Sequence, residues 1–479
     1  MPAEASVKSA KQEPTGLVRG LSAWDGVLLV IGGVIGSAIF LVPKDVAAAL
    51  PSPPLFLGVW VAGGVLALMG ALVFAELGAM FPEAGGQYVY LREAYGDFAA
   101  FLYGWLMFVA GNGGGIATIA VAFAVYLGKV VRPLEASVAV LSLPGLGWKS
   151  GHLVQTTWNL TRGDLVAVAA IVLLTFINMR GLRPAVLLQN VTTWMKYAAI
   201  AAFIVFGFVM GRGSWSHFNM GGVREAFTPG LSPFMAATGV AFIAVFWAYE
   251  GWVYVAWVAG EVREPERNVP RSLILGVLAV ILIYSTINAA YLYALPVTAI
   301  AKQDAIGQAA AQVLFSPVAA YWITVVIAIA CFSATSSNVL AGARISYAMA
   351  HDGLFFHRMG NVHPQHRTPA FALVAQGALA CVFALSGTYD QLFTYTEFGM
   401  ILSYVATVGA LFVLRRTRPD TPRPYRCWGY PWMPALYVVL IAGWLANTTF
   451  ERPKEAVSCL VLSAIGLPGY LYWKRGFGR

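Results

Sequence analysis

The stretch "VIGGVIGSAIF", residues Val30 to Phe40, decides the fold, because it places three glycines and a serine inside an apolar run. Each glycine weakens a helix by about 0.5–1 kcal/mol relative to alanine. A segment that crosses a bilayer nevertheless has to satisfy its own backbone hydrogen bonds. We therefore predict a membrane-spanning helix that is interrupted within this stretch.

The rest of the chain has the composition of a membrane protein. Of its 479 residues, 59% are hydrophobic and only 11% are charged, and the mean hydropathy is +0.69. Apolar runs of about 20 residues, enough to cross about 30 Å of hydrocarbon, recur along the chain. They predict an all-α integral membrane protein with twelve transmembrane helices. Their expected cores are residues 24–42, 55–77, 98–127, 165–178, 186–210, 234–259, 273–294, 318–349, 370–385, 392–414, 434–446 and 456–472.

A second interruption lies five spans after the first. The sixth span contains "VFWAYEGWVY", in which Glu250 and Gly251 break an apolar run. Interruptions at matching positions are typical of two inverted repeats with a binding site near the membrane midplane. This predicts a cytoplasmic tail at 1–23, five-helix repeats at 24–211 and 233–414, two accessory helices at 431–473, and a cytoplasmic tail at 474–479.

The basic residues indicate the orientation of the chain. With the N-terminus inside, twenty of the 31 Lys and Arg residues fall in inner segments and ten in outer segments, while Lys196 lies within a span. We therefore expect a multi-pass protein of the cell membrane, embedded in the lipid bilayer with both termini cytoplasmic. Residues 1–20 have no apolar core typical of a signal peptide, so the first span is expected to direct insertion.

Several classes of partner and cofactor are disfavoured by the sequence. The net charge of +9 is spread over alternate loops, which argues against a nucleic acid partner. The four cysteines lack metal-ligand spacing, and the six histidines lie in loops or at span ends. We therefore predict no metal and no cofactor. Because the spans carry no convergent His, Cys or paired-carboxylate set, we also predict that the chain is not an enzyme.

Several stretches resemble the amino acid/polyamine/organocation superfamily of permeases, and most closely its L-amino acid transporter branch. They are "VIGSAIF", "AELGAMFPEAGGQYVYLREAYG", "NMRGLRPAVLLQN", "FWAYEGW" running into "EVREPERNVPR", and "ARISYAMAHDG". The resemblance implies a LeuT-type 5+5 inverted repeat followed by two further helices, and amino acid transport without ATP hydrolysis. Three positions depart from the family pattern: Ala38 replaces a usual glycine, His351 a usual arginine, and Glu250 a usual glycine or aspartate.

The two interruptions could bind the two charges of an amino acid. The start of the outer half of the first span would expose N–H groups to a carboxylate, and the break in the sixth span would expose carbonyl groups to an ammonium. The alternative is close helix packing through small residues such as Gly32 and Gly36. The resemblance adds Trp247 as a gating aromatic and Tyr284 as a residue that touches the site. The predicted substrate-binding residues are Ile35, Gly36, Ser37, Ala38, Trp247, Ala248, Tyr249, Glu250, Gly251 and Tyr284.

Lys196 is the most informative single residue, because a buried ammonium group needs partners or a function. It lies about 15 Å into the fifth span at about 1.5 Å per residue. The resemblance implies that such a lysine replaces the cation of sodium-coupled relatives, with Ser333 and Ser336 as its neighbours in the eighth span. Two interpretations of its role remain open: a fixed positive charge, or a proton carrier. Glu250 is also open: it would receive a cationic side chain, carry protons, or point away.

These observations favour a sodium-independent transporter of L-amino acids, working by alternating access as an exchanger or a proton symporter. One alternative is a proton-coupled transporter of cationic amino acids or polyamines. Alternatives of another class are a membrane-embedded enzyme and a nutrient sensor that binds without transporting. Residues 128–163 contain no cysteine. The branch members linked to a heavy chain by a disulfide use a cysteine there, so we expect no such partner and a prokaryotic membrane.

Overall fold

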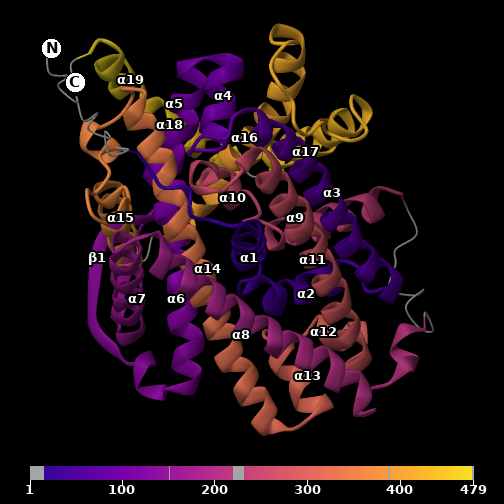
Figure 1. Cartoon of the computed structure of the whole chain (residues 1–479). Helices are drawn as coiled ribbons and strands as arrows, with labels where there is room; N and C mark the ends of the chain where they lie inside the picture. Colours follow the sequence, from indigo (N-terminus) through magenta and orange to yellow (C-terminus); the bar gives the residue numbers. More distant parts are fainter. Residues whose placement is uncertain (1–15, 150–151, 220–230, 387–388, 452, 477–479) are drawn as a thin grey trace, which may run out of the picture.

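A computed structural model of the chain describes residues 16–149, 152–219, 231–386, 389–451 and 453–476. Parts of both predicted tails, residues 1–15 and 477–479, lie outside the described residues. The described chain is mainly helical (Figure 1). In the first half the helices are α1 (Ala23–Val34), α2 (Ala38–Ala49), α3 (Pro53–Met80), α4 (Gln87–Tyr95), α5 (Asp97–Leu106), η1 (Met107–Asn112), α6 (Gly113–Val130), η2 (Arg132–Glu135), α7 (Arg162–Met179), α8 (Leu182–Val209) and η3 (Trp215–Phe218).

The second half of the chain repeats the pattern of long helices joined by short ones. A broken helix comes first, as in the first half, and is followed by long apolar helices. They are α9 (Leu231–Ala248), α10 (Tyr254–Trp257), η4 (Ala259–Glu261), α11 (Pro265–Ala294), α12 (Val297–Ile300), α13 (Ile306–Leu314), α14 (Pro317–His351), η5 (His357–Gly360), α15 (Ala370–Ser386), α16 (Tyr389–Thr417), α17 (Trp432–Glu451), α18 (Pro453–Ile465) and α19 (Leu467–Lys474).

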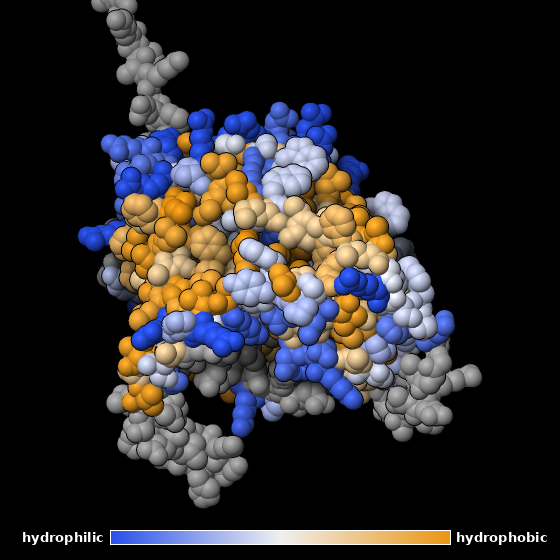
Figure 2. All heavy atoms as spheres, turned by 90° about the horizontal axis from the view of Figure 1, so that it is seen from below, coloured by the Kyte–Doolittle hydropathy of each residue, from blue (hydrophilic) through white to orange (hydrophobic). Residues whose placement is uncertain are grey.

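Many of these helices have the length and composition of membrane spans. Among the described residues, eight are long and apolar enough to cross a bilayer, and α1 with α2 makes a ninth if the bent pair counts as one span. Three shorter apolar helices lie at residues 234–248, 370–386 and 432–447. Figure 2 shows apolar residues over much of one face, with hydrophilic residues along its upper edge and in patches across its lower half. The chain is therefore a multi-pass membrane protein.

The predicted interruption of the first span is present, with a bend of 49° between α1 and α2. Helix α1 starts at a capping box, in which the Ser22 hydroxyl accepts from the Asp25 N–H and the Asp25 carboxylate accepts from the Ser22 N–H. It ends at Val34, and Ser37 precedes the first turn of α2. Both pieces lie in the middle of the molecule, among α3, α8, α11 and α14 (Figure 1).

The sixth span is interrupted in the same way. Helix α9 ends at Ala248, and the chain turns through residues 249–253 before the single turn of α10. Gly251 has φ +112°, a backbone conformation that side chains with a Cβ rarely adopt. Helix α11 starts at Pro265, where the missing N–H costs nothing because the first helical N–H has no partner within the helix.

The prediction of an all-α chain is wrong in one segment. Strands β1 (Ser137–Lys149) and β2 (His152–Thr161) form an antiparallel hairpin between α6 and α7. β-branched residues are frequent in this segment, and they favour strands. An outer loop defined only by the gap between two apolar spans gives no information on its own secondary structure.

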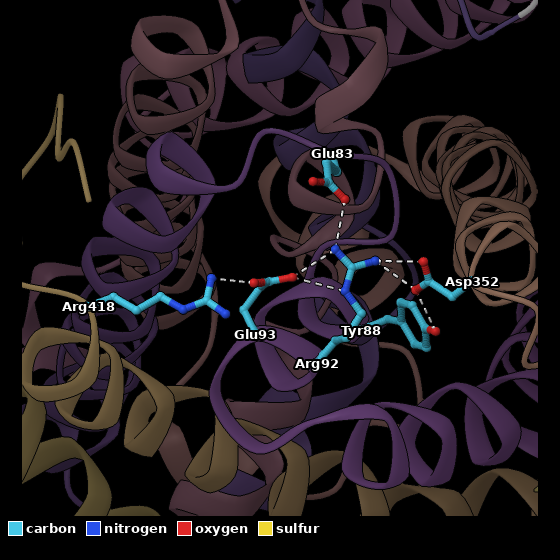
Figure 3. Close-up of polar contacts among 6 residues, drawn as sticks. All are labelled: Glu83, Tyr88, Arg92, Glu93, Asp352 and Arg418. Carbon is cyan, nitrogen blue, oxygen red and sulfur yellow. Dashed lines mark hydrogen bonds and ion pairs between the residues drawn. The ribbon is translucent and has the colours of Figure 1, made fainter. Parts of the chain in front are cut away.

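Charged residues join the loops at the end of the molecule where α14 and α16 end. The Arg92 guanidinium lies 2.7 Å from Asp352, 3.0 Å from Glu83 and 2.9 Å from Glu93, and Glu93 also pairs with Arg418 at 2.5 Å (Figure 3). We call Glu83, Tyr88, Arg92, Glu93, Asp352 and Arg418 the peripheral network. Burial and the nearby Asp352 carboxylate raise the pKa of Tyr88, whose hydroxyl donates to Asp352 at 2.8 Å. The network connects α4 to the ends of α14 and α16.

A second cluster of charged residues, which we call the Glu76 cluster, consists of Glu76, Arg415 and Arg423 and holds the segment after α16. Glu76 on α3 is fully buried, and its carboxylate accepts from the Arg415 guanidinium at 2.6 and 3.0 Å and from the Cys427 N–H at 2.6 Å. The Arg423 guanidinium lies 3.4 Å from the same carboxylate. A buried carboxylate needs such partners, because an unpaired charge in a protein interior is costly. Glu76 thus anchors the segment between α16 and α17 to α3.

Candidate functional site

The two helix interruptions meet at a pair of glycines. A Cβ added to Gly251 would lie 2.8 Å from the backbone carbon and oxygen of Gly33. A Cβ on Gly33 would in turn lie 2.7 Å from the Tyr254 ring. Because real Cβ atoms do not approach other atoms so closely, the contact requires glycine at both positions. The first and sixth spans therefore touch through bare backbone at their interruptions.

A cavity of about 80 Å³ lies beside this contact. A single water needs about 10–15 Å³, so the cavity can hold several waters or a small solute. It is lined by residues of both broken spans, of the third span (α5, η1 and α6), of α14 and of α16. They are Gly33, Val34, Gly36, Ser37, Ala38, Met107, Gly111, Asn112, Gly115, Thr118, Ile119, Trp247, Glu250, Tyr254, Trp257, Ala334, Asn338 and Met400.

The start of α2 presents N–H groups at this cavity. The hydrogen bonds of the described residues leave the Ser37 and Ala38 N–H groups without an acceptor, as expected for the first turn of a helix. The Gly36 N–H differs, because it donates to the Val34 carbonyl at 2.9 Å. Two of the three predicted N–H donors are therefore available to an anion, and the partial positive charge of the helix N-terminus favours one.

Tyr284 of α11 connects the two interruptions through hydrogen bonds from its hydroxyl group. Its hydroxyl lies 3.1 Å from the Val34 carbonyl oxygen and 2.9 Å from the Ala248 carbonyl oxygen. These oxygens belong to the last residues of α1 and α9, where helical carbonyls have no partner within the helix. The Tyr284 hydroxyl thus lies against the ends of both half-helices. The Val34 oxygen also accepts from the Gly36 N–H, whereas the Ala248 oxygen retains a lone pair for another donor.

Lys196 of α8 is buried, with 1% of its surface exposed. Its ammonium group donates to the Gly32 carbonyl at 2.8 Å and to the Ile35 carbonyl at 2.7 Å. Both carbonyls lie at the C-terminal end of α1, where the helix dipole is negative. The lysine therefore places a cationic group against the first interruption from outside the cavity.

The two serines predicted beside Lys196 lie on α14 but make other contacts. Ser333 lies 3.1 Å from the Thr192 hydroxyl and 3.3 Å from the Thr193 hydroxyl, one turn before the lysine on α8. Ser336 is buried, and its hydroxyl has no hydrogen-bond partner among the described residues. Neither serine is hydrogen-bonded to Lys196 in the described part of the chain.

The remaining predicted residues divide between the cavity and the surrounding packing. Trp247 and Glu250 line the cavity, and the Glu250 carboxylate accepts from the Tyr404 hydroxyl of α16 at 2.5 Å. Tyr249 points away: its hydroxyl donates to the Trp60 carbonyl on α3 at 3.0 Å. Ala248 contributes its carbonyl and Gly251 its backbone contact, as described above.

The sequence did not predict that the third span, which consists of α5, η1 and α6, and helix α14 line the cavity. Met107, Gly111 and Asn112 line the cavity from η1, a π-helical segment between α5 and α6. Such segments are frequent at functional sites. The unusual "GNGGG" sequence at residues 111–115 is the signal that could have indicated this wall. Asn338 of α14 gave no comparable signal.

The described residues contain no group of three or more His, Cys, Asp or Glu side chains that could hold a metal ion. What the site does offer is N–H donors, carbonyl acceptors, one carboxylate and two amide side chains around a small cavity. Such a set can bind a small zwitterion.

Residues 21–463 match the family described as amino acid permease. The serine/threonine exchanger SteT of Bacillus subtilis (strain 168) is 31% identical over 466 residues, covering 97% of this chain and 98% of the relative. The b(0,+)-type amino acid transporter 1 of Mus musculus is 29% identical, covering 99% of this chain and 93% of the relative. The human large neutral amino acids transporter small subunit 2 is 28% identical, covering 93% and 79%. The chain therefore belongs to the amino acid permease family.

Proposed function

We propose that this protein is a sodium-independent secondary transporter of L-amino acids, an exchanger or a proton symporter, that works by alternating access. The observation that carries the proposal is the cavity between two helix interruptions, with free N–H groups on one wall and helix-end carbonyls behind it. The names of the relatives, which include an exchanger of serine and threonine, support the same function.

The proposed binding mode follows from the charges of the substrate. The carboxylate binds the Ser37 and Ala38 N–H groups at the start of α2. The ammonium binds the carbonyls at the ends of α1 and α9, near Val34 and Ala248, and Trp247 covers the bound molecule. The substrate side chain then faces Glu250 and the amides of Asn112 and Asn338. No ATP is needed, because the gradient of a second amino acid or of protons drives transport.

Lys196 supports independence from sodium. Its ammonium group binds two carbonyls at the end of α1, a position in which a bound cation would otherwise neutralise the helix end. We propose that Lys196 supplies this charge permanently or exchanges a proton during the cycle, and that Ser333 and Ser336 support α8 against α14.

We further propose twelve spans in two inverted repeats of five, followed by two helices. The three shorter apolar helices complete the set begun by the eight long helices and the bent pair. Both termini are cytoplasmic, the membrane is prokaryotic, and no disulfide-linked heavy chain is needed, because residues 128–163 contain no cysteine.

The test is counterflow in proteoliposomes loaded with a panel of unlabelled amino acids. We expect uptake of a labelled amino acid that depends on the internal amino acid or on a proton gradient, and that is unchanged when potassium replaces sodium. Chemical conversion of the substrate would identify an enzyme instead. Saturable binding without flux would identify a sensor, and uptake that requires sodium would remove the proposed role of Lys196.

A second candidate, a transporter of cationic amino acids or polyamines, is favoured by the Glu250 carboxylate in the cavity wall. Glu250→Gln keeps the size of the side chain and its ability to accept from Tyr404, but removes the charge. If a cationic side chain binds there, uptake of lysine falls about tenfold or more while uptake of alanine stays within about twofold, since charge-assisted hydrogen bonds are about twice as strong as neutral ones.

Glu93→Gln in the peripheral network is the matched control, because it removes a carboxylate that does not line the cavity. If Glu250→Gln takes up lysine, alanine and leucine at the same rates as the wild-type protein does, this second candidate is excluded.

A further inference from the structure

The chain between the last turn of α16 and the start of α17 is strongly basic. Residues 415–426 hold five arginines and a single acidic residue, Asp420. Three of these arginines belong to the Glu76 cluster or to the peripheral network and are paired there. The other two, Arg416 and Arg426, are exposed, and neither makes a hydrogen bond or an ion pair among the described residues. The segment therefore offers two cations to an external partner.

The backbone that carries these two arginines is held in place by the Glu76 cluster. Arg416 directly follows Arg415, whose guanidinium binds the Glu76 carboxylate. Arg426 directly precedes Cys427, whose N–H donates to the same carboxylate at 2.6 Å. A second guanidinium of the cluster donates to four backbone carbonyls within residues 414–421, at 2.8–3.1 Å. A partner that binds here does not have to order a loose loop, which would weaken its affinity.

Two tryptophans of the same segment have almost no cover. Trp428 is 76% exposed, and Trp432, the first residue of α17, is 82% exposed, the highest values among the large hydrophobic residues of the described chain. Tyr430 lies between them and is packed, with its ring 3.7 Å from the Arg415 guanidinium and 5.3 Å from the Phe412 ring. The fold thus packs one aromatic ring of the three and leaves two outside.

The position of the tryptophans indicates what covers them. Helix α17 begins at Trp432 and has an apolar composition over residues 432–447. A tryptophan at the end of such a helix lies at the boundary between hydrocarbon and water, where its apolar ring and polar N–H are both accommodated. The neighbours at that depth are lipid headgroups. Anionic headgroups attract arginine, and a guanidinium can bind two oxygens of one phosphate group.

We propose that Arg416 and Arg426, together with Trp428 and Trp432, form a binding site for the phosphate groups of anionic phospholipids, in the leaflet that surrounds the end of α16. The arginines bind the phosphate oxygens, and the indole rings pack on the apolar part of the lipid below them. In the orientation proposed above this is the cytoplasmic leaflet. The site lies outside the cavity, and neither the residues of the cavity nor transport enters the argument.

The test is lipid binding to the purified full-length protein in detergent, without any amino acid. Phosphatidylglycerol and phosphatidylcholine with identical acyl chains are titrated separately, and native mass spectrometry counts the protein that carries an added lipid. We expect the wild-type protein to bind phosphatidylglycerol about thirtyfold more tightly, since two arginines contribute about 1 kcal/mol each toward an anionic lipid. Equal affinity for the two lipids would overturn the proposal.

The variant is the double substitution Arg416→Gln with Arg426→Gln. It should lose the preference for phosphatidylglycerol and keep its affinity for phosphatidylcholine within about twofold, because only the anionic headgroup needs the cations. The unfolding temperature should not change, since both side chains are exposed and unpaired. A lower unfolding temperature with an unchanged lipid preference would show that the arginines only support the fold. If the double variant does not purify, Arg426→Gln alone should weaken phosphatidylglycerol binding about fivefold, and unchanged binding would contradict the proposal.

The matched control is Arg263→Gln with Arg267→Gln, which removes two exposed arginines from the segment after η4. Because Glu264 and Glu266 flank these arginines, the lipid preference should stay within about twofold of wild type. An equal loss in this control would mean that net charge alone sets the preference, and would overturn the site. An excess of inorganic phosphate should leave the lipid bound, since it makes no contact with the tryptophans. Displacement by phosphate would identify a soluble anion as the ligand and would exclude the lipid.

Discussion

At the scale of single residues, Lys196 combines a charge with a low-polarity environment by binding carbonyls that a helix leaves without partners. The last carbonyls of α1 need donors, and the ammonium group needs acceptors. The Gly32 and Ile35 carbonyls meet both requirements at 2.8 and 2.7 Å. The interruption of the first span and the buried lysine therefore depend on each other.

Lys196→Ala should impair both stability and transport. The substitution leaves two buried carbonyls without their donor, at a cost of about 1–3 kcal/mol for each unsatisfied group, so the unfolding temperature in detergent should fall. Uptake should fall about tenfold or more, because the end of α1 loses its neutralising charge. Lys129→Ala, which removes an exposed ammonium above the Tyr126 ring, is the control. Wild-type uptake and pH dependence in Lys196→Ala would exclude both proposed roles of the lysine.

At the scale of secondary-structure elements, the site depends on two broken helices that approach each other without side chains. Gly33 and Gly251 permit a backbone contact that any Cβ would prevent. Tyr284 holds the same two elements through the Val34 and Ala248 carbonyls. The interruptions are therefore fixed relative to each other, and they are expected to move as one unit against α14.

Gly251→Ala tests the contact between the interruptions. The new methyl group would lie 2.8 Å from the Gly33 backbone, and alanine would have to adopt φ +112°. We expect loss of transport and a fall in stability of about 1–3 kcal/mol from the backbone strain alone. The measurements are uptake in proteoliposomes and thermal unfolding.

Gly443→Ala is the matched control for this prediction. It lies within α17 with open space around it, so alanine should be tolerated or stabilise the helix by up to about 1 kcal/mol. A functional Gly251→Ala variant with wild-type stability would show that the two interruptions do not need this contact.

The sequence predicts these elements unequally. The "VIGSAIF" and "FWAYEGW" stretches predicted both interruptions, because clustered glycines or a charged residue inside an apolar run disfavour a continuous membrane helix. The Gly33–Gly251 contact could not be predicted, since it pairs residues more than two hundred positions apart. The same reason applies to Asn338 in the cavity wall. It also applies to the buried ion pair between Glu261 of η4 and Arg344 of α14, for which the sequence gives the charges but not the partners. The hairpin at residues 137–161 was missed because hydropathy reports only on the spans.

At the scale of the whole molecule, many charged side chains lie toward the two ends, whereas Lys196 and Glu250 lie at the interruptions. The peripheral network and the Glu76 cluster lie at the end where α16 finishes, and the Lys44–Asp304 pair joins α2 to the segment between α12 and α13. Charges placed beyond the apolar part of the helices are expected for a protein that spans a bilayer.

The proposed orientation predicts opposite labelling of two exposed positions. Asp304→Cys should react with an impermeant maleimide on intact cells, because the Asp304 side chain is 91% exposed at the outer end. Arg416→Cys, at an exposed position in the last turn of α16, should react only when the membrane is permeabilised. The unmodified chain is the control for the four native cysteines. Labelling of both positions on intact cells, or of the Arg416 position alone, would contradict cytoplasmic termini.

The Lys44–Asp304 pair differs from the Glu261–Arg344 pair in its contact with water. Its side chains are 38% and 91% exposed, whereas those of the other pair are fully buried. Dissolved salt screens exposed charges much more than buried ones. Salt is therefore expected to weaken the Lys44–Asp304 contact and to leave the Glu261–Arg344 contact nearly unchanged. We therefore expect any salt dependence of the proposed alternating-access cycle to come from exposed pairs such as Lys44–Asp304 rather than from the buried pair.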